Sequence, residues 1–103
     1  MLLVTIHHIP GREFEVLGMV KGAVVQSKHL GKDFMAGMKT LVGGEIVGYP
    51  EMITEARQIA TKRMVDAAEA LGADAVVGMR YASAAVMQGA AEVIAYGTAV
   101  KYK

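Results

Sequence analysis

Two adjacent histidines, His7 and His8, are the residues of this sequence best suited to bind a metal ion. Imidazole nitrogen suits ions such as zinc, copper or nickel, and methionine or glutamate side chains could complete a site. Neighbouring residues of a strand point to opposite faces, so these two are not expected to share one ion within a subunit. A ring of subunits could instead contribute one histidine each. The simpler alternative is a strand end with two exposed imidazoles.

Sulfur ligands for soft metal ions are scarce in this chain. It contains no cysteine, which excludes disulfides, thiol nucleophiles and thiolate metal sites. Among its eight methionines, only Met35 and Met38 form an M-x-x-M pair. Met38 falls on the apolar stripe of a predicted helix, so packing explains these side chains better than copper binding does. A divalent metal ion held by imidazole and carboxylate groups is therefore the one cofactor that we consider.

The stretch LVGGEIVGY, residues 41–49, places one carboxylate, Glu45, among three glycines. The first two glycines fit a helix end followed by a chain reversal, and Pro50 favours a helix start. The glycines thus have structural explanations, whereas Glu45 has none and is a candidate ligand-binding residue. Elsewhere we find no nucleophile–base pair, metal-ligand spacing or phosphate loop, so the sequence does not predict an enzyme.

Length and composition predict one domain, residues 1–103, that associates with copies of itself. Hydrophobic residues make up 53% of the chain and charged residues 20%, and there are twelve glycines in addition. Average usage is about 45–50% apolar residues, glycine included, and about 25% charged residues. Because a small monomer must keep a large surface polar, the apolar excess favours a homo-oligomer.

Several other partners and locations are disfavoured. The net charge of +1 gives no electrostatic basis for binding nucleic acid or an anionic membrane surface. No run approaches the roughly 20 apolar residues of a membrane span. The start, MLLVTIHHIPG, lacks the basic region of a signal peptide. Together with the lack of cysteine, these features lead us to expect a cytoplasmic protein.

Hydrophobic periodicity predicts four strands and two helices in the order ββααββ. The predicted strands cover residues 2–6, 13–27, 73–86 and 90–102, and the predicted helices lie in residues 31–44, with Gly43 just past the helix end, and 50–71. The second helix has an alanine-rich apolar stripe, and the last strand has a face of small residues, Gly97 among them, that should contact it. We therefore predict an α+β fold with two layers, in which a mostly antiparallel sheet packs on two helices.

Three segments, GADAVVG (72–78), MQGAAEVIAYGTAV (87–100) and GKDFMAGMKTLVGGEIVGY (31–49), together resemble the YbjQ-like family of small bacterial proteins. The match extends over nearly the whole chain. The resemblance implies a ring-forming α+β subunit, with a homo-oligomer of five copies, a pentamer, as the expected assembly. It implies no established activity, although the family carries a heavy-metal-binding label. The motif TIHH departs from the family pattern, so the two histidines gain no support from the resemblance.

Five polar residues in the segments that match the family are candidate ligand-binding residues: Asp33, Glu45, Tyr49, Arg57 and Glu92. Arg57 lies at the edge of the apolar helix stripe, where it could pair with a carboxylate in a structural role. At a subunit interface, the same residues could instead line a pocket for a small ligand.

Our leading hypothesis is a homo-oligomer that binds a metal ion or a small ligand at its subunit interfaces. The first alternative is a structural or protein-interaction oligomer without a small ligand. The second, least favoured, is a hydrolase that uses the carboxylates. Binding of a divalent metal or a metabolite to chelator-treated protein would separate the first two, because ligand binding raises the melting temperature.

Overall fold

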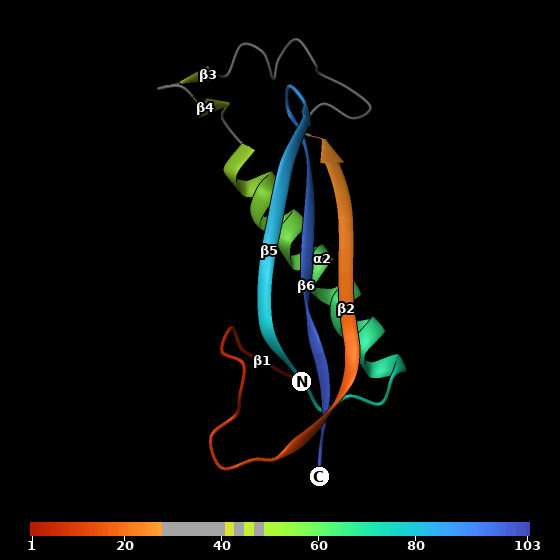
Figure 1. Ribbon diagram of the computed structural model, residues 1–103. Coiled ribbons are helices and arrows are strands. Elements are labelled where there is room, and N and C mark those ends of the chain that lie inside the picture. The colour runs from red at the N-terminus through yellow and green to blue at the C-terminus, as the bar shows by residue number, and fades with distance from the viewer. Residues whose placement is uncertain (28–40, 43–44, 47–48) are drawn as a thin grey trace.

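The computed structural model describes residues 1–27, 41–42, 45–46 and 49–103 (Figure 1). In chain order its elements are β1 (Leu2–Leu3), β2 (Phe14–Ser27), β3 (Leu41–Val42), β4 (Glu45–Ile46), α2 (Tyr49–Ala70), β5 (Ala75–Met87) and β6 (Ala90–Tyr102). Among the described residues, no helix combines the length and the apolar character that crossing a membrane requires.

Four strands form a mixed sheet in the order β1-β5-β6-β2. β1 runs parallel to β5, whereas β5 and β2 both pair with β6 in antiparallel fashion. β2 and β6 pair from Phe14 opposite Tyr102 to Ser27 opposite Ala90. Gly89, with a φ of 78°, supplies a left-handed residue in the tight turn between β5 and β6. The three long strands therefore lie side by side, with α2 crossing behind them (Figure 1).

The predicted ββααββ fold with two helices is wrong. The described residues contain one helix and a four-stranded mixed sheet, in addition to the short pair β3 and β4. Leu41 and Val42, expected at the end of a first helix, form β3, and Val42 pairs with Glu45. A short apolar run fits a helix stripe and a strand equally well, which explains the error. The rest of that predicted stretch, residues 31–40 and 43–44, lies outside the described residues.

The boundaries of α2 follow from local sequence. Pro50 suits the first turn of a helix because it has no N–H to leave unpaired, and Glu51 places a negative charge near the helix N-terminus. At the other end Gly72 has a φ of 80°. The N–H of Ala73 donates to the carbonyl oxygen of Ala68 at 3.1 Å, which is the closing bond of a glycine-terminated helix.

One face of the sheet packs against α2. The helix contributes a buried stripe made of Met52, Ala56, Ala60, Met64 and Ala68. The small alanine side chains let the helix lie very close to β2. The approach is so close at Gly22 that a Cβ added there would clash with backbone atoms of Ala60 and Met64. Gly97, which we expected on this face, lies opposite Val20 on it, and the nearest atom to a Cβ added there would be Cγ1 of Val76 on β5, at 2.6 Å.

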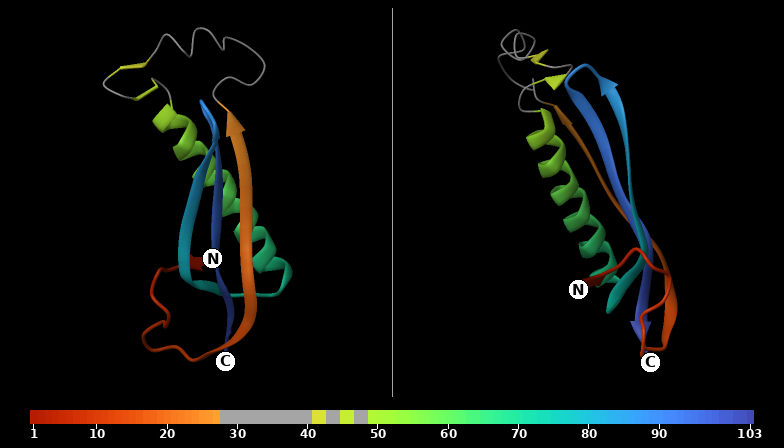
Figure 2. Two further views of the ribbon diagram at one scale, coloured as in Figure 1. Left: turned by 45° about the horizontal axis from the view of Figure 1, so that its top comes forward. Right: turned by 90° about the vertical axis from the view of Figure 1, so that its left-hand side faces the viewer.

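The opposite face of the sheet is covered over only part of its length. A second cluster of Ala75, Val77 and Val100 packs there against Val4 and Ile9 of the N-terminal segment. Towards the β5–β6 turn, no described residue covers this side of the sheet, as the side view shows (Figure 2). The uncovered side chains alternate along each strand with those that face α2.

We call this uncovered region the open sheet face. It comprises Met19, Lys21, Ala23 and Val25 of β2, Arg80, Ala82 and Ala84 of β5, and Glu92, Ile94, Tyr96 and Thr98 of β6.

Candidate functional site

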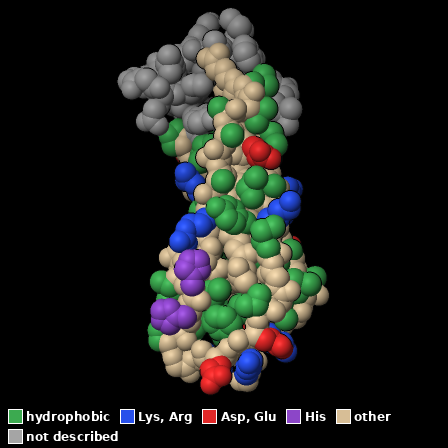
Figure 3. All heavy atoms as spheres, in the orientation of Figure 1, with side chains coloured by type: hydrophobic (Ala, Val, Ile, Leu, Met, Phe, Trp, Pro, Cys, Tyr) green, Lys and Arg blue, Asp and Glu red, His purple; other side chains and the backbone are tan. Residues whose placement is uncertain are grey.

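His7 and His8 lie in the N-terminal segment that runs beside β5, and both are exposed. The N–H of Gly78 donates to the carbonyl oxygen of Ile6 at 2.8 Å, which holds this segment on the sheet. The ring of His7 lies over Gly78, because a Cβ added there would be 2.8 Å from Nδ1 of His7. Figure 3 shows the two histidines next to each other on one side of the molecule.

The described residues do not form a metal site within one chain. No group of three or more His, Cys, Asp or Glu side chains in that part of the structure could hold a metal ion. The assignment of a metal to His7 and His8 therefore stays a prediction, and any further donors would have to come from other copies or from outside the described residues.

The candidate ligand-binding residues fall in different places. Arg57 is exposed on α2, which covers one face of the sheet, whereas Glu92 is half-buried on the open sheet face opposite. One chain therefore does not bring these two side chains together. Glu45 lies in β4 and Tyr49 begins α2, and only their backbone placement is described. Asp33 lies outside the described residues.

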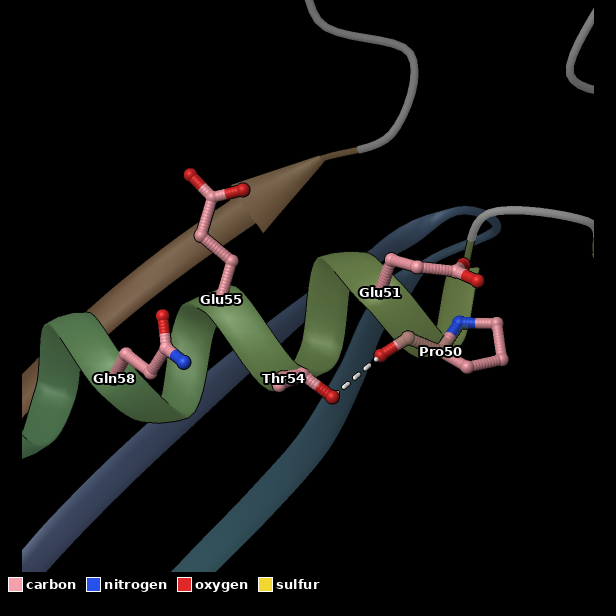
Figure 4. Close-up of a pocket in the computed structure, with 5 residues that line it drawn as sticks. All are labelled: Pro50, Glu51, Thr54, Glu55 and Gln58. Carbon is pink, nitrogen blue, oxygen red and sulfur yellow. Dashed lines mark hydrogen bonds between the residues drawn. The ribbon is translucent and has the colours of Figure 1, made fainter.

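A shallow hollow of about 620 Å³ lies beside the first turns of α2, lined by Pro50, Glu51, Thr54, Glu55 and Gln58 (Figure 4). The hydroxyl of Thr54 donates to the carbonyl oxygen of Pro50 at 3.0 Å. Glu51 and Glu55 are both exposed, one helical turn apart. These two carboxylates have no third His, Cys, Asp or Glu side chain beside them among the described residues with which to hold a metal ion. We therefore do not regard this hollow as a metal site.

A second hollow of about 420 Å³ lies along the middle of α2, lined by Gln58, Ile59, Lys62, Arg63 and Asp66. Lys62 and Asp66 form an ion pair at 3.1 Å, with both side chains largely exposed. Such a pair contributes little to stability because water and salt screen it. Arg63 reaches from the helix to β2, where its Nη1 donates to the carbonyl oxygen of Ala23 at 2.7 Å. These charged groups are thus engaged with their own chain.

The open sheet face is the most unusual surface among the described residues. Met19 is 71% exposed, Val25 62% and Tyr96 38%. Single exposed apolar side chains are ordinary, but a contiguous patch on a sheet face marks an interaction surface. Hydrophobic side chains run along this face, and lysine or arginine side chains flank them on both sides (Figure 3).

The sequence analysis did not identify a row of two charged residues and one tyrosine that crosses this face. Lys21, Tyr96 and Arg80 lie opposite one another on the three long strands. The strand alternation could have indicated Lys21, since it is the lone charged residue within an apolar run of β2. The alignment with Arg80 depends on a bulge at Gly78 and Met79, which local sequence does not specify.

A protein-family model matches the whole chain. A YbjQ family model, described as "Putative heavy-metal-binding", matches residues 1–103. The chain belongs to this family.

Similar proteins cover the chain from end to end. A UPF0145 protein of Clostridium novyi is 61% identical over 101 residues, covering 98% of both chains. A UPF0145 protein of Thermus thermophilus is 58% identical over 102 residues, covering 98% of this chain and 90% of the relative. Neither name states an activity, so the family is uncharacterised in its function.

A solved structure supports the fold. It is the crystal structure of a protein with unknown function of the DUF74 family from Pediococcus pentosaceus, and it matches with a TM-score of 0.66. The match covers 100% of this chain and 98% of the other at 17% sequence identity. At this identity the likeness concerns the fold alone.

The heavy-metal description of the YbjQ family fits this chain poorly. Soft metal ions are selected by thiolate ligands, and the sequence contains no cysteine. The described residues also lack a cluster of histidine and carboxylate ligands. The donors that are present suit a borderline or harder divalent ion, and one described chain offers too few of them.

Proposed function

We propose that this YbjQ family member is the subunit of a homo-oligomer that holds a small ligand or a divalent metal ion where subunits meet. The observation that carries the proposal is the open sheet face, on which Met19 and Val25 are more than half exposed. Covering that face removes apolar surface from water and stabilises an assembly by roughly 25 cal/mol per Å² before the cost of association. Five copies is the number that the family resemblance implies.

We place the ligand at an interface because neither hollow on α2 encloses a volume. The two hollows on α2 are shallow and open to solvent. Arg57, Glu92 and the two histidines occupy separate surfaces, so they can line a common pocket only through contact with other copies. Small-ligand sites commonly lie between domains or subunits, where surfaces from both sides enclose the ligand.

Two measurements on the untagged chain test this proposal. Native mass spectrometry at micromolar concentration should give a multiple of the 10.9 kDa subunit mass. A stable monomer would overturn the proposal. Chelator-treated protein should then melt at a higher temperature with at least one divalent metal ion or metabolite, because binding to the folded form stabilises it.

A second candidate function is a structural or protein-interaction oligomer without a ligand. The apolar character of the open sheet face favours it, because that face by itself accounts for assembly. The ligand screen discriminates the two candidates. An oligomer whose melting temperature is unchanged by every metal and metabolite tested, at a fixed protein concentration, would support the structural role.

A further inference from the structure

The N-terminal segment is fixed to β5 on both sides of a bulge. Three main-chain hydrogen bonds of 2.8–3.0 Å join them: Val4 N–H to Val76 O, Met79 N–H to Val4 O and Gly78 N–H to Ile6 O. A side chain adds a fourth link, because Nη1 of Arg80 donates to the carbonyl oxygen of Thr5 at 2.9 Å. The backbone around the bulge is therefore held in one arrangement, and such a rigid frame can position side chains for a ligand.

Gly78 leaves space for the ring of His7. Its φ of 62° lies in the region that residues with a side chain rarely adopt. A Cβ added to Gly78 would be 2.8 Å from Nδ1 and 2.9 Å from Cε1 of His7, so any larger residue would push the ring away. Bulges are common beside functional sites, where they re-aim side chains. The imidazole of His7 is thus seated on β5 two residues before Arg80.

The guanidinium of Arg80 is held through one nitrogen, which leaves its other edge available. Nη1 donates to the carbonyl oxygens of Thr5 at 2.9 Å and Met79 at 2.8 Å. Nε and Nη2, which form the other edge of the group, donate to no described residue. This edge is a planar pair of donors that fits two oxygen atoms of one anion. Because the group is already fixed, binding there costs little side-chain entropy.

Arg80 keeps an unpaired positive charge beside the histidines. Among the described residues no carboxylate forms an ion pair with it. In the same part of the chain, no group of three or more His, Cys, Asp or Glu side chains could surround a metal ion. Figure 3 shows the two histidines next to a lysine or arginine side chain. A divalent cation bound to His7 would be repelled by Arg80, whereas an anion would be attracted by it.

We propose that Arg80 and His7 together bind a phosphate group, either as inorganic phosphate or at the end of a phosphate monoester. Two phosphate oxygens accept hydrogen bonds from Nε and Nη2 of Arg80, and a third accepts one from an imidazole N–H of His7. A carboxylate has only two oxygens, and the guanidinium alone would engage both. This inference rests on the proposed ligand-binding function and names the class of ligand. Its donors belong to one chain, and a neighbouring copy would only enclose the rest of the ligand.

A longer polyanion fits this place less well than a single phosphate group. Nucleic acid offers a row of phosphates and needs an extended basic surface, whereas the net charge of the chain is +1. Lys21 lies on the same sheet face, but β6 separates its strand from β5, which puts the two strands about 10 Å apart. Lys21 also has no hydrogen bond or ion pair with a described residue. Arg80 and Lys21 are therefore separate positive charges, of which Arg80 is the one fixed by its own chain.

Calorimetric titration of the untagged chain with inorganic phosphate, at fixed ionic strength in a phosphate-free buffer, tests the site. Binding should saturate at millimolar phosphate, and Arg80→Met should weaken it by about tenfold or more. Lys21→Met is the matched control, because it removes one positive charge from the same face, and it should change the affinity by less than about twofold. Arg80→Lys is a second variant, should methionine release the N-terminal segment. Lysine keeps the charge but lacks the planar fork, so it should weaken binding by about threefold or more.

Two glycine substitutions test the contribution of His7 without changing any charge. Gly78→Ala puts a methyl group against the ring of His7 and should weaken phosphate binding by about threefold or more, as His7→Ala should. Gly72→Ala is the matched control, because Gly72 has a φ of 80° but nothing lies within 4 Å of the added Cβ. Both alanines strain the backbone, whereas only Gly78→Ala should change the affinity. Melting curves without phosphate establish that each variant is folded.

Two further probes identify the source of the phosphate group. Phenyl phosphate that binds more tightly than inorganic phosphate supports a monoester, and phenyl phosphate that binds equally or more weakly supports free phosphate. Acetate should bind about tenfold more weakly than inorganic phosphate, because it lacks the third oxygen for His7. Acetate that binds as tightly as phosphate overturns the assignment of the phosphate group.

The outcomes separate this inference from the proposed function. Equal losses of affinity in Arg80→Met and Lys21→Met would mean that phosphate responds to net charge alone, which overturns the site. An original chain that does not bind phosphate overturns it too, while a homo-oligomer stabilised by another metabolite or a metal ion would still satisfy the proposed function. Conversely, a monomeric chain that binds phosphate through Arg80 and His7 overturns the proposed assembly and leaves this site standing.

Discussion

Nη1 of Arg63 on α2 donates a hydrogen bond to the carbonyl oxygen of Ala23 on β2 at 2.7 Å. β2 is an edge strand, paired on one side only with β6. An unpaired strand edge can template association with other chains, and a charged group bound to it hinders such pairing. The bond therefore ties the helix to the sheet and occupies one acceptor of the free edge.

Replacing Arg63 by methionine should lower the free energy of unfolding by about 0.5–1 kcal/mol, because a solvent-exposed hydrogen bond contributes modestly. Methionine keeps much of the packing of the arginine stem. Arg57→Met is the matched control, since the guanidinium of Arg57 has no partner among the described residues, and its effect should stay within about 0.5 kcal/mol. Urea denaturation of the three proteins measures both changes; equal effects would contradict this role of Arg63.

Gly22→Ala should destabilise the protein by about 1–3 kcal/mol, because the new methyl group would clash with the helix backbone at Ala60 and Met64. The helix cannot move away without losing contact with β2. Ala23→Ser is the control on the next residue, whose side chain lies on the open sheet face, and it should change stability by less than about 0.5 kcal/mol. An unchanged melting temperature for Gly22→Ala would mean that the close approach of α2 to β2 is misplaced.

Tyr81 and Thr61 join β5 to α2 through a hydrogen bond of 2.7 Å between their hydroxyl oxygens. The hydroxyl of Thr61 already donates to the carbonyl oxygen of Arg57 at 2.7 Å, so Tyr81 is the donor in the pair. Tyr81→Phe should lower the free energy of unfolding by about 0.5–1 kcal/mol, because this hydrogen bond is lost. A double-mutant cycle with Thr61→Val should give a coupling energy above zero. Strictly additive effects would argue against the bond.

The elements with strong local signals were predictable from sequence. α2 spans Tyr49–Ala70, against a predicted helix at 50–71, because an apolar stripe, Pro50 and Gly72 mark its face and ends. β6 spans Ala90–Tyr102, as its pattern predicted. The parallel pairing of Leu2 with Ala75 was not predictable, because no local feature specifies a partner more than 70 positions away. That pairing makes the sheet mixed.

The candidate site was less predictable than the fold. The open sheet face exists because α2 covers only one side of β2 and β6, which depends on tertiary packing and not on composition. The apolar excess indicated exposed apolar surface but could not place it. Arg57 and Glu92 were grouped by sequence segment, yet the sheet separates them. His7 lies over Gly78 because the N-terminal segment runs beside β5, a contact between distant parts of the chain.

Soft heavy-metal ions should bind this protein weakly, despite the description attached to its family. Thiolate, the ligand that selects such ions, is absent from the sequence. Met64 and Met52 are buried in the core, where their thioethers are committed to packing. The exposed thioethers of Met1, Met19 and Met87 are neutral, weaker donors, so the main ligands that remain are imidazole and carboxylate, chiefly His7 and His8, both exposed. Calorimetry on the chelator-treated protein should therefore show weak binding of zinc or nickel.

Replacing His7 and His8 by alanine should abolish that weak binding, since no other described imidazole is available. Each substitution removes an exposed side chain, so the fold should survive, and an unchanged melting temperature without metal is the control. The same titration with copper(I), mercury or cadmium distinguishes binding by histidine imidazole from binding by methionine sulfur. Submicromolar binding of these ions that persists in the double-alanine variant would show that methionine sulfur forms the site. That result would overturn the assignment of the metal to histidine. It would also overturn the packing role given to the methionines.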